Sequence, residues 1–203
     1  MAITLEKGQR INLEKSNGTK LLNVCVGVNW GAIESKNWLG LKKIEAVDLD
    51  ASCATYDDNN KEKEVIYFRN LKSNNGAIKH SGDDLVGDTG GDDGLDNEII
   101  SVDLSKIDSN VTKIAFVLNS FRGQDFKSIP FASIRLYEGT ATKVNEVIAK
   151  YDIANDSTFS GKVSMVLGVL YKKNGEWKFN AIGESTNDKD LKGTLSTVTS
   201  KYL

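Results

Sequence analysis

Apolar and polar residues alternate with a period of two along most of this chain, the pattern of half-buried β-strands. Asn-Gly pairs at 17–18 and 174–175 predict tight hairpin turns beside two of the strands. So many short strands predict an all-β protein built as a two-sheet β-sandwich. The predicted strands are residues 2–5, 10–14, 21–28, 44–56, 64–68, 99–102, 113–118, 132–137, 146–151, 163–171 and 176–182.

The C-terminal segment alone has a helical pattern. Its apolar stripe comprises Leu191, Leu195, Val198 and Tyr202. Their spacing of four, three and four predicts a short helix at about 188–202, with Asn187 or Asp188 as its cap. The helix is expected to cover an edge or face of a sheet. With no internal repeat or domain boundary in view, residues 1–203 are predicted to form one domain.

Composition narrows the class of protein. Hydrophobic residues make up 39% of the chain, enough for a core, and the net charge of −2 provides no basic surface for nucleic acid. No stretch is long and apolar enough to span a bilayer, so we expect a cytoplasmic protein that is not membrane-spanning. Cys25 and Cys53 lie in apolar runs without a CxxC partner and are expected to be buried free thiols.

Negative charge is concentrated in residues 83–98. This segment holds seven carboxylates and no Lys or Arg, and glycines interrupt it repeatedly. Like charges at this density repel, so a folded loop needs a counter-charge. Hard divalent cations with oxygen ligands provide one, and glycines allow the sharp turns that such a site needs. The sequence therefore predicts a long acidic loop that binds Ca²⁺.

A strand supplies further oxygens. In 44–56, Asp48, Asp50 and Ser52 share one face, while the opposite face is apolar. Carboxylates side by side on a sheet repel one another, so their presence favours a shared cation. Because Ca²⁺ takes about six to eight oxygens, we expect the acidic loop to fold over this strand and complete the site.

The loop fits no standard calcium motif. Counting back eleven residues from Glu98 puts Gly87 at the first position of an EF-hand, where Asp is required. A nonapeptide repeat would need one residue fewer and more than one copy. A solvated acidic loop without metal is the plain alternative. Mg²⁺ prefers fewer carboxylates, and zinc is disfavoured because His80 is the only histidine.

Two chemical alternatives compete with a non-enzymatic binding module. The carboxylates suit a metal-dependent hydrolase using Mg²⁺ or Ca²⁺, although the chain lacks HExxH and P-loop motifs. Handling of tellurite or oxidants by the two thiols is the other, and it requires exposed cysteines of low pKa. His80 is expected to pack or hydrogen-bond in the loop. Trp38 is expected to be a core or rim aromatic, in a segment (36–43) that is either a packed crossover or an exposed partner-binding loop.

Several segments together resemble the TerD domain family of bacterial tellurium-resistance and general-stress proteins over essentially the whole chain. The matching segments are Val-Gly-Val-Asn-Trp at 26–30, Asp-Leu-Asp-Ala-Ser at 48–52, His-Ser-Gly-Asp-Asp at 80–84, Asp-Asn-Glu-Ile-Ile at 96–100, Val-Asp-Leu-Ser-Lys-Ile at 102–107, and residues 170–183. The acidic loop is longer here than in the usual family pattern.

The resemblance implies a calcium-binding β-sandwich that acts in a stress response with other TerD-like proteins and a membrane protein of the same system. It implies metal ligands in the acidic segments, where Asp92 and Asp93 compete with Asp96 and Glu98 for one role. The candidate ligands are Asp48, Asp50, Asp83, Asp84, Asp92, Asp93, Asp96, Asn97 and Glu98.

Overall fold

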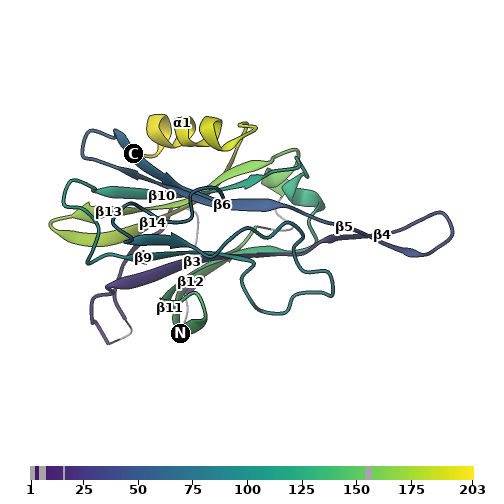
Figure 1. Ribbon diagram of the computed structural model, residues 1–203, viewed down its shortest axis with the longest axis horizontal. Helices are drawn as coiled ribbons and strands as arrows, with labels where there is room; N and C mark the ends of the chain where they lie inside the picture. Colours follow the sequence, from purple (N-terminus) through teal and green to yellow (C-terminus); the bar gives the residue numbers. More distant parts are fainter. Residues whose placement is uncertain (1–2, 5–7, 16, 154–156) are drawn as a thin grey trace.

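The computed structural model describes residues 3–4, 8–15, 17–153 and 157–203. Two six-stranded sheets lie face to face (Figure 1). The first sheet contains, in order, β1 (Ile3–Thr4), β12 (Lys143–Asp152), β11 (Ala132–Thr140), β3 (Asn23–Trp30), β9 (Glu98–Asp103) and β8 (Ile78–His80). The second contains β2 (Arg10–Asn12), β14 (Glu176–Thr186), β13 (Ser164–Lys173), β10 (Lys113–Ser120), β6 (Leu49–Tyr56) and β7 (Glu62–Ile66). The predicted two-sheet sandwich is confirmed; residues 2 and 5 of the first predicted strand lie outside the described residues.

Strand alternation builds the core. On β6, Leu49, Ala51 and Cys53 point into the main hydrophobic cluster between the sheets. Ala54 and Tyr56, one step out of phase, belong to a second cluster on the outer face of the second sheet. Both faces of β6 are therefore buried, and a side chain on its outer face is removed from water even when it is polar.

The helix α1 (Leu191–Lys201) covers the outer face of the second sheet (Figure 1). Leu195 and Val198 are buried there against β10 and β13, so the predicted helix and its apolar stripe are confirmed. The predicted cap was wrong. Asp190 is the last extended residue before the helix, and its Oδ1 accepts a hydrogen bond of 2.7 Å from the Gly193 amide.

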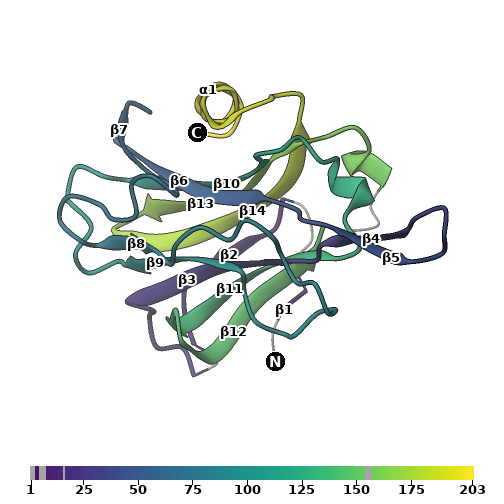
Figure 2. The ribbon, with the colours of Figure 1, turned by 45° about the vertical axis from the view of Figure 1, so that its right-hand side comes forward.

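The predicted strand 44–56 is two strands in the structure. β5 (Lys42–Glu45) pairs with β4 (Ile33–Lys36) in a separate two-stranded hairpin, and residues 46–48 interrupt the chain before β6. The interruption has a physical cause, because the Val47 amide bonds to the acidic loop at Val86 (3.0 Å) instead of continuing a ladder. The hairpin projects from one end of the molecule (Figures 1 and 2). The packed-crossover interpretation of this segment was wrong.

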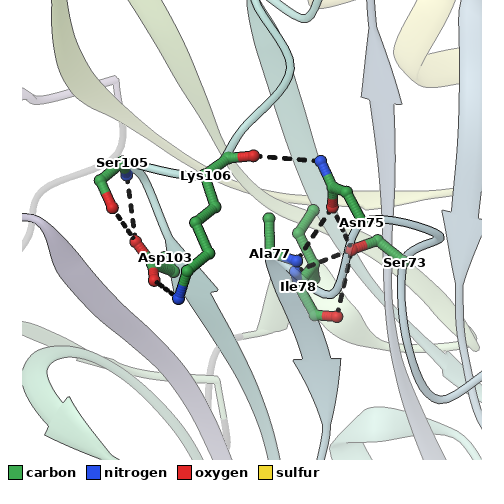
Figure 3. Close-up of polar contacts among 7 residues, drawn as sticks. All are labelled: Ser73, Asn75, Ala77, Ile78, Asp103, Ser105 and Lys106. Atoms are coloured by element: carbon green, nitrogen blue, oxygen red, sulfur yellow. Dashed lines mark hydrogen bonds and ion pairs between the residues drawn. The ribbon is translucent and has the colours of Figure 1, made fainter.

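The strands β8 and β9 flank the acidic loop, and their ends away from it are tied together (Figure 3). Asn75 donates from Nδ2 to the Lys106 carbonyl (3.0 Å), and Ser73 Oγ accepts from the Ile78 amide (2.9 Å). Beyond β9, Asp103 pairs with Lys106 at 2.5 Å. The two strands that hold the loop are thus fixed by bonds independent of the loop itself.

Candidate metal centre

Three carboxylates from strand and loop meet at the start of β6. Asp50 lies on its buried outer face, Asp48 is buried directly before the strand, and Asp83 lies at the start of the acidic loop. One oxygen of each is within 4.8 Å of the others. We call this set the strand-side cluster. The expected approach of the loop to the strand is thus found.

Burial and mutual repulsion make the charged form of this cluster costly. Burial, followed by the charges of Glu98, Asp48 and Asp83, raises the pKa of Asp50 to about 7. Burial also raises the pKa of Asp48, although the nearby Arg122 guanidinium opposes this rise. Carboxyl groups with raised pKa values, held close together, gain more from a bound cation than solvated ones do.

One oxygen of the cluster has no partner. Arg122 lies 3.3 Å from Asp48 Oδ2, but Asp48 Oδ1 is buried and has no hydrogen-bond partner among the described residues. The hydroxyl of Ser52, on the same face of β6, is also buried without a partner. Buried polar atoms are nearly always paired, so these oxygens mark a position for a ligand, an ion or water.

A second group lies within the loop. One oxygen each of Asp88, Asp92 and Asp93 falls within 4.8 Å of the others, a set that we call the loop cluster. Asp92 also accepts from Asn29 Nδ2 at 2.8 Å. Asp88 was not among the candidate ligands. Composition placed it in the acidic segment, but its position beside Asp92 and Asp93 depends on backbone pairing with Gly31, which joins segments far apart in sequence.

Glu98 and His80 close an open edge of β6. The strand β7 pairs with β6 only from Cys53 onward, leaving residues 49–52 without a strand neighbour on that side. There the Ala51 amide donates to Glu98 Oε2 (2.7 Å), and the Ala51 carbonyl accepts from His80 Nε2 (2.9 Å). Glu98 is fully buried, and its Oε1 accepts from the Asp84 amide.

The His80–Glu98 pair is enclosed by protein. Burial raises the pKa of Glu98, against the hydrogen bond and charge of His80. Burial lowers the pKa of His80, but the hydrogen bond and charge of Glu98 outweigh it, so the net shift is upward. His80 Nδ1 accepts from the Gly82 amide, a bond that protonation of this nitrogen would break. The expectation that His80 hydrogen-bonds within the loop region is confirmed.

Asn97 and Asp84 hold the two halves of the acidic loop together. Asn97 Nδ2 donates to Asp84 Oδ2 (3.2 Å) and Asp88 Oδ1 (3.1 Å), while its Oδ1 accepts from the Trp30 amide. Asp84 Oδ1 accepts from two loop amides, those of Val86 and Gly87. These two candidate ligands already make several hydrogen bonds that shape the loop.

Asp96 lies apart from both clusters. Its Oδ1 forms a 2.7 Å ion pair with Arg135, and its side chain is nearly buried. The pair lies on the backbone of Gly27, where an added Cβ would come within 2.0 Å of the Asp96 carboxylate. Burial raises the pKa of Asp96, with Arg135 opposing the rise. Glycine at position 27 is therefore what lets this carboxylate reach its arginine.

Both clusters have dimensions that suit a calcium ion. Ca²⁺ binds oxygens at about 2.3–2.6 Å, so two ligands on opposite sides of one ion are about 4.6–5.2 Å apart. The carboxylate oxygens within each cluster lie inside that limit. The partnerless oxygen of Asp48 gives the strand-side cluster the stronger fit. The ligand roles of the nine candidate residues stay predictions.

Neither of the two thiols belongs to a carboxylate cluster. Cys53 is completely buried, and Cys25 Sγ bonds weakly to Ser101 Oγ (3.5 Å). Burial raises the pKa of both thiols, which disfavours reactive thiolates. Cys25 borders a pocket of about 600 Å³, whose lining residues include Lys79 and Lys106 but neither carboxylate cluster. Both cysteines are free and buried, as expected.

Fold and site together define a class: a two-sheet β-sandwich whose one end holds two carboxylate clusters, one between strand and loop and one within the loop. The TerD domain family matches residues 1–197, and the chain belongs to this family. Among the described residues, no helix is long and apolar enough to cross a membrane.

Relatives of similar length carry stress and resistance names. The chain is 37% identical to stress response protein SCP2 of Bacillus subtilis, over 97% of this chain and 98% of that protein. It is 33% identical to tellurium resistance protein TerZ of Serratia marcescens, over 99% of both. A solved TerD homologue from Streptomyces coelicolor has the same fold, with a TM-score of 0.64 at 15% identity, covering 89% of this chain and 96% of that one.

Proposed function

We propose that this protein is a non-enzymatic calcium-binding module of a bacterial stress response of the tellurium-resistance type. A Ca²⁺ ion at the strand-side cluster would join β6 to the acidic loop, and a second would order the loop cluster. The residues that would hold the first ion are Asp48, Asp50 and Asp83. Bound calcium would neutralise the negative charge of these carboxylates. It would thereby order the loop, which could then serve as a binding surface for a partner.

The observation that carries this proposal is the buried, partnerless Oδ1 of Asp48 beside two further carboxylates. Two buried carboxylates with a third beside them destabilise the fold unless they are protonated or their charge is neutralised. Arg122 offers one half-exposed positive charge on one side. A divalent cation neutralises more of the negative charge, and the free oxygen of Asp48 can serve as one of its ligands.

The family supports the biological part of the proposal. Relatives that match nearly the whole chain are named for stress response and tellurium resistance. Partners of the kind that the family resemblance implies, other TerD-domain proteins and a membrane protein of the same system, fit a module whose loop is ordered by metal.

The hydrolase alternative has weaker support. The single histidine of the chain, His80, is buried and engaged with the Ala51 carbonyl and the Gly82 amide, so it is poorly placed to act as a general base. Thiol chemistry is disfavoured by the burial of Cys25 and Cys53. A binding role for the carboxylates requires neither group.

Thermal melts of the metal-stripped protein test the proposal. Added Ca²⁺ is expected to raise the melting temperature by about 5–10 °C at a hundredfold excess over its Kd, because ligand binding to the native state adds about 2.7 kcal/mol. Asp83→Ala removes an exposed carboxylate of the strand-side cluster and should lose most of this rise. Asp58→Ala removes an exposed carboxylate in the β6–β7 turn and should keep it.

Magnesium provides the second comparison. A site rich in carboxylates favours Ca²⁺, so an equal excess of Mg²⁺ should produce a much smaller rise. The proposal fails if Ca²⁺ produces no shift in the parent protein, if Mg²⁺ stabilises equally, or if Asp83→Ala and Asp58→Ala respond alike.

A further inference from the structure

The tip hairpin, formed by β4, β5 and the turn at 37–41, exposes large apolar side chains. Trp38 is 90% exposed, Leu39 59% and Leu41 60%. Ile44 on β5 is exposed as well. The hairpin projects along the long axis of the molecule, away from both sheets (Figures 1 and 2). The expectation that Trp38 is a core or rim aromatic was wrong. Exposed apolar side chains grouped in this way are typical of an interaction site.

The apex is an ordered turn. Asn37 Oδ1 accepts from the amides of Leu39 (3.0 Å) and Leu41 (2.9 Å), and the Asn37 amide donates to the Leu41 carbonyl. Gly40 takes the left-handed conformation (φ +78°) that the turn needs, which favours glycine. The apolar side chains are therefore displayed in a defined arrangement, which lowers the entropy lost when they are buried.

Positive charge surrounds the apex. Lys36, Lys42 and Lys43 flank the turn, and residues 36–43 contain no acidic side chain. Glu34, one step closer to the base, pairs with Lys42 at 2.6 Å. An apolar apex ringed by lysines is complementary to a surface that is negatively charged outside and apolar beneath.

The residues just before and just after the hairpin are bonded to the acidic loop. The Ala32 amide donates to the Asp88 carbonyl (2.9 Å), the Asp88 amide to the Trp30 carbonyl (3.0 Å), and the Val47 amide to the Val86 carbonyl (3.0 Å). Asp88 is itself a member of the loop cluster. Ordering of the loop by a cation would consequently fix the base from which the hairpin projects.

The chemistry of the apex favours an anionic bilayer over a protein partner. Lysine is depleted in protein–protein interfaces, and a convex turn of a few residues offers little of the area that a stable interface buries. Tryptophan and leucine, in contrast, partition into the headgroup region of a membrane, while adjacent lysines contact anionic lipids. Four-residue strands lift the apex about 13 Å from the base, clear of the acidic loop.

We propose that the tip hairpin docks this protein on an anionic membrane surface by inserting Trp38, Leu39 and Leu41 among the headgroups, with the flanking lysines on the phosphates. Calcium in the acidic loop strengthens this docking by fixing the hairpin base, a part of the inference that rests on the proposed function.

Co-sedimentation with lipid vesicles tests the docking. The full chain is expected to bind vesicles of phosphatidylcholine with phosphatidylglycerol, and to bind pure phosphatidylcholine much less. Trp38→Ala, and separately Lys42→Glu with Lys43→Glu, should weaken binding roughly tenfold or more. All variants are compared at one Ca²⁺ concentration, because calcium alone can bridge carboxylates to lipid phosphates.

Matched substitutions elsewhere provide the controls. Leu22→Ser removes a leucine outside the hairpin that is as exposed as Leu41, and Lys61→Glu with Lys63→Glu reverses two exposed lysines at the start of β7. Both should bind like the parent protein. Equal binding by Trp38→Ala and the parent, or no binding to anionic vesicles, overturns the proposal. A dimer in solution that Trp38→Ala dissociates would also overturn it, by identifying a second copy as the occupant.

The calcium dependence separates the two proposals. A chelator is expected to weaken vesicle binding severalfold without abolishing it. If calcium changes neither vesicle binding nor the melting temperature, the proposed function is contradicted. The proposal that the hairpin docks on membranes is then still supported by the vesicle binding itself. If calcium stabilises the protein but the protein does not bind anionic vesicles, only the docking proposal is overturned.

Discussion

At the scale of single residues, Asp50 is an acidic side chain in surroundings that disfavour its charge. It lies 7% exposed on a strand, with Glu98, Asp48 and Asp83 close enough to raise its pKa to about 7. The native protein therefore holds a proton here between about pH 4 and pH 7, where the unfolded chain has already released it. Without a metal ion, stability contributed by this proton is present at low pH and is lost as pH rises through about 7.

A raised pKa of Asp50 predicts that the metal-free protein becomes less stable as the pH rises. In a chelator, the free energy of unfolding should fall between pH 5 and pH 8 by at most about 3 kcal/mol, because each of the two pH units between pH 5 and the raised pKa of about 7 costs about 1.36 kcal/mol. Because Ca²⁺ binds the ionised carboxylates, its stabilising effect should grow over the same range. Urea denaturation at several pH values measures both.

Asp50→Asn is the matched variant for this profile. The neutral amide should flatten the metal-free pH dependence and make the metal-free protein more stable than the parent at pH 8, while weakening its response to Ca²⁺. A metal-free parent whose stability rises steadily from pH 5 to pH 8 would contradict the electrostatic account of Asp50.

At the scale of elements, the join between β6 and the first sheet is made by side chains. Glu98 on β9 and His80 on β8 take the backbone groups of Ala51 that no neighbouring strand uses. The acidic loop connects these two strands, so its ends are held against β6 whether or not a cation is present. This contact gives Glu98 a structural role that is separate from any role as a ligand.

Substitution of Glu98 should therefore destabilise the fold even without metal. Glu98→Ala leaves the Ala51 and Asp84 amides without their acceptor and removes the partner of His80, which is expected to cost about 3 kcal/mol or more in a chelator. Asp83→Ala, at an exposed position, should change the metal-free stability by less than about 0.5 kcal/mol. Equal metal-free stability of the two variants would show that Glu98 does not hold the edge of β6.

Period-two alternation predicted most strands because each needs only a local pattern of burial. It missed β4, whose two faces are both largely exposed, and β8, which is only three residues long. It also merged β5 with β6, because the break at 46–48 is imposed by the acidic loop through the bond from Val47 to Val86. Non-local contacts of this kind leave no local periodicity.

Non-local contacts also limited what the sequence could predict about the candidate metal centre. Composition identified the acidic loop, and alternation identified Asp48 and Asp50 on one face, so the meeting of strand and loop was predictable. The ion pair of Asp96 with Arg135 and the place of Asp88 in the loop cluster follow from strand order and loop pairing, which no single segment specifies.

At the scale of the whole molecule, the acidic loop and the tip hairpin share one end of the sandwich, and the loop is bonded to the residues just before and after the hairpin. The helix α1 lies on the outer face of the second sheet and completes a separate hydrophobic cluster. The carboxylate clusters and the exposed apolar apex thus lie at one end of the molecule, and the sandwich supports both.

A crystal structure of the protein grown with Ca²⁺ would show directly whether the carboxylates bind the ion. We predict an ion in the strand-side cluster, at about 2.3–2.6 Å from oxygens of Asp48, Asp50 and Asp83. A cluster filled by a lysine or arginine side chain, or by water at hydrogen-bonding distance in saturating Ca²⁺, would contradict the account.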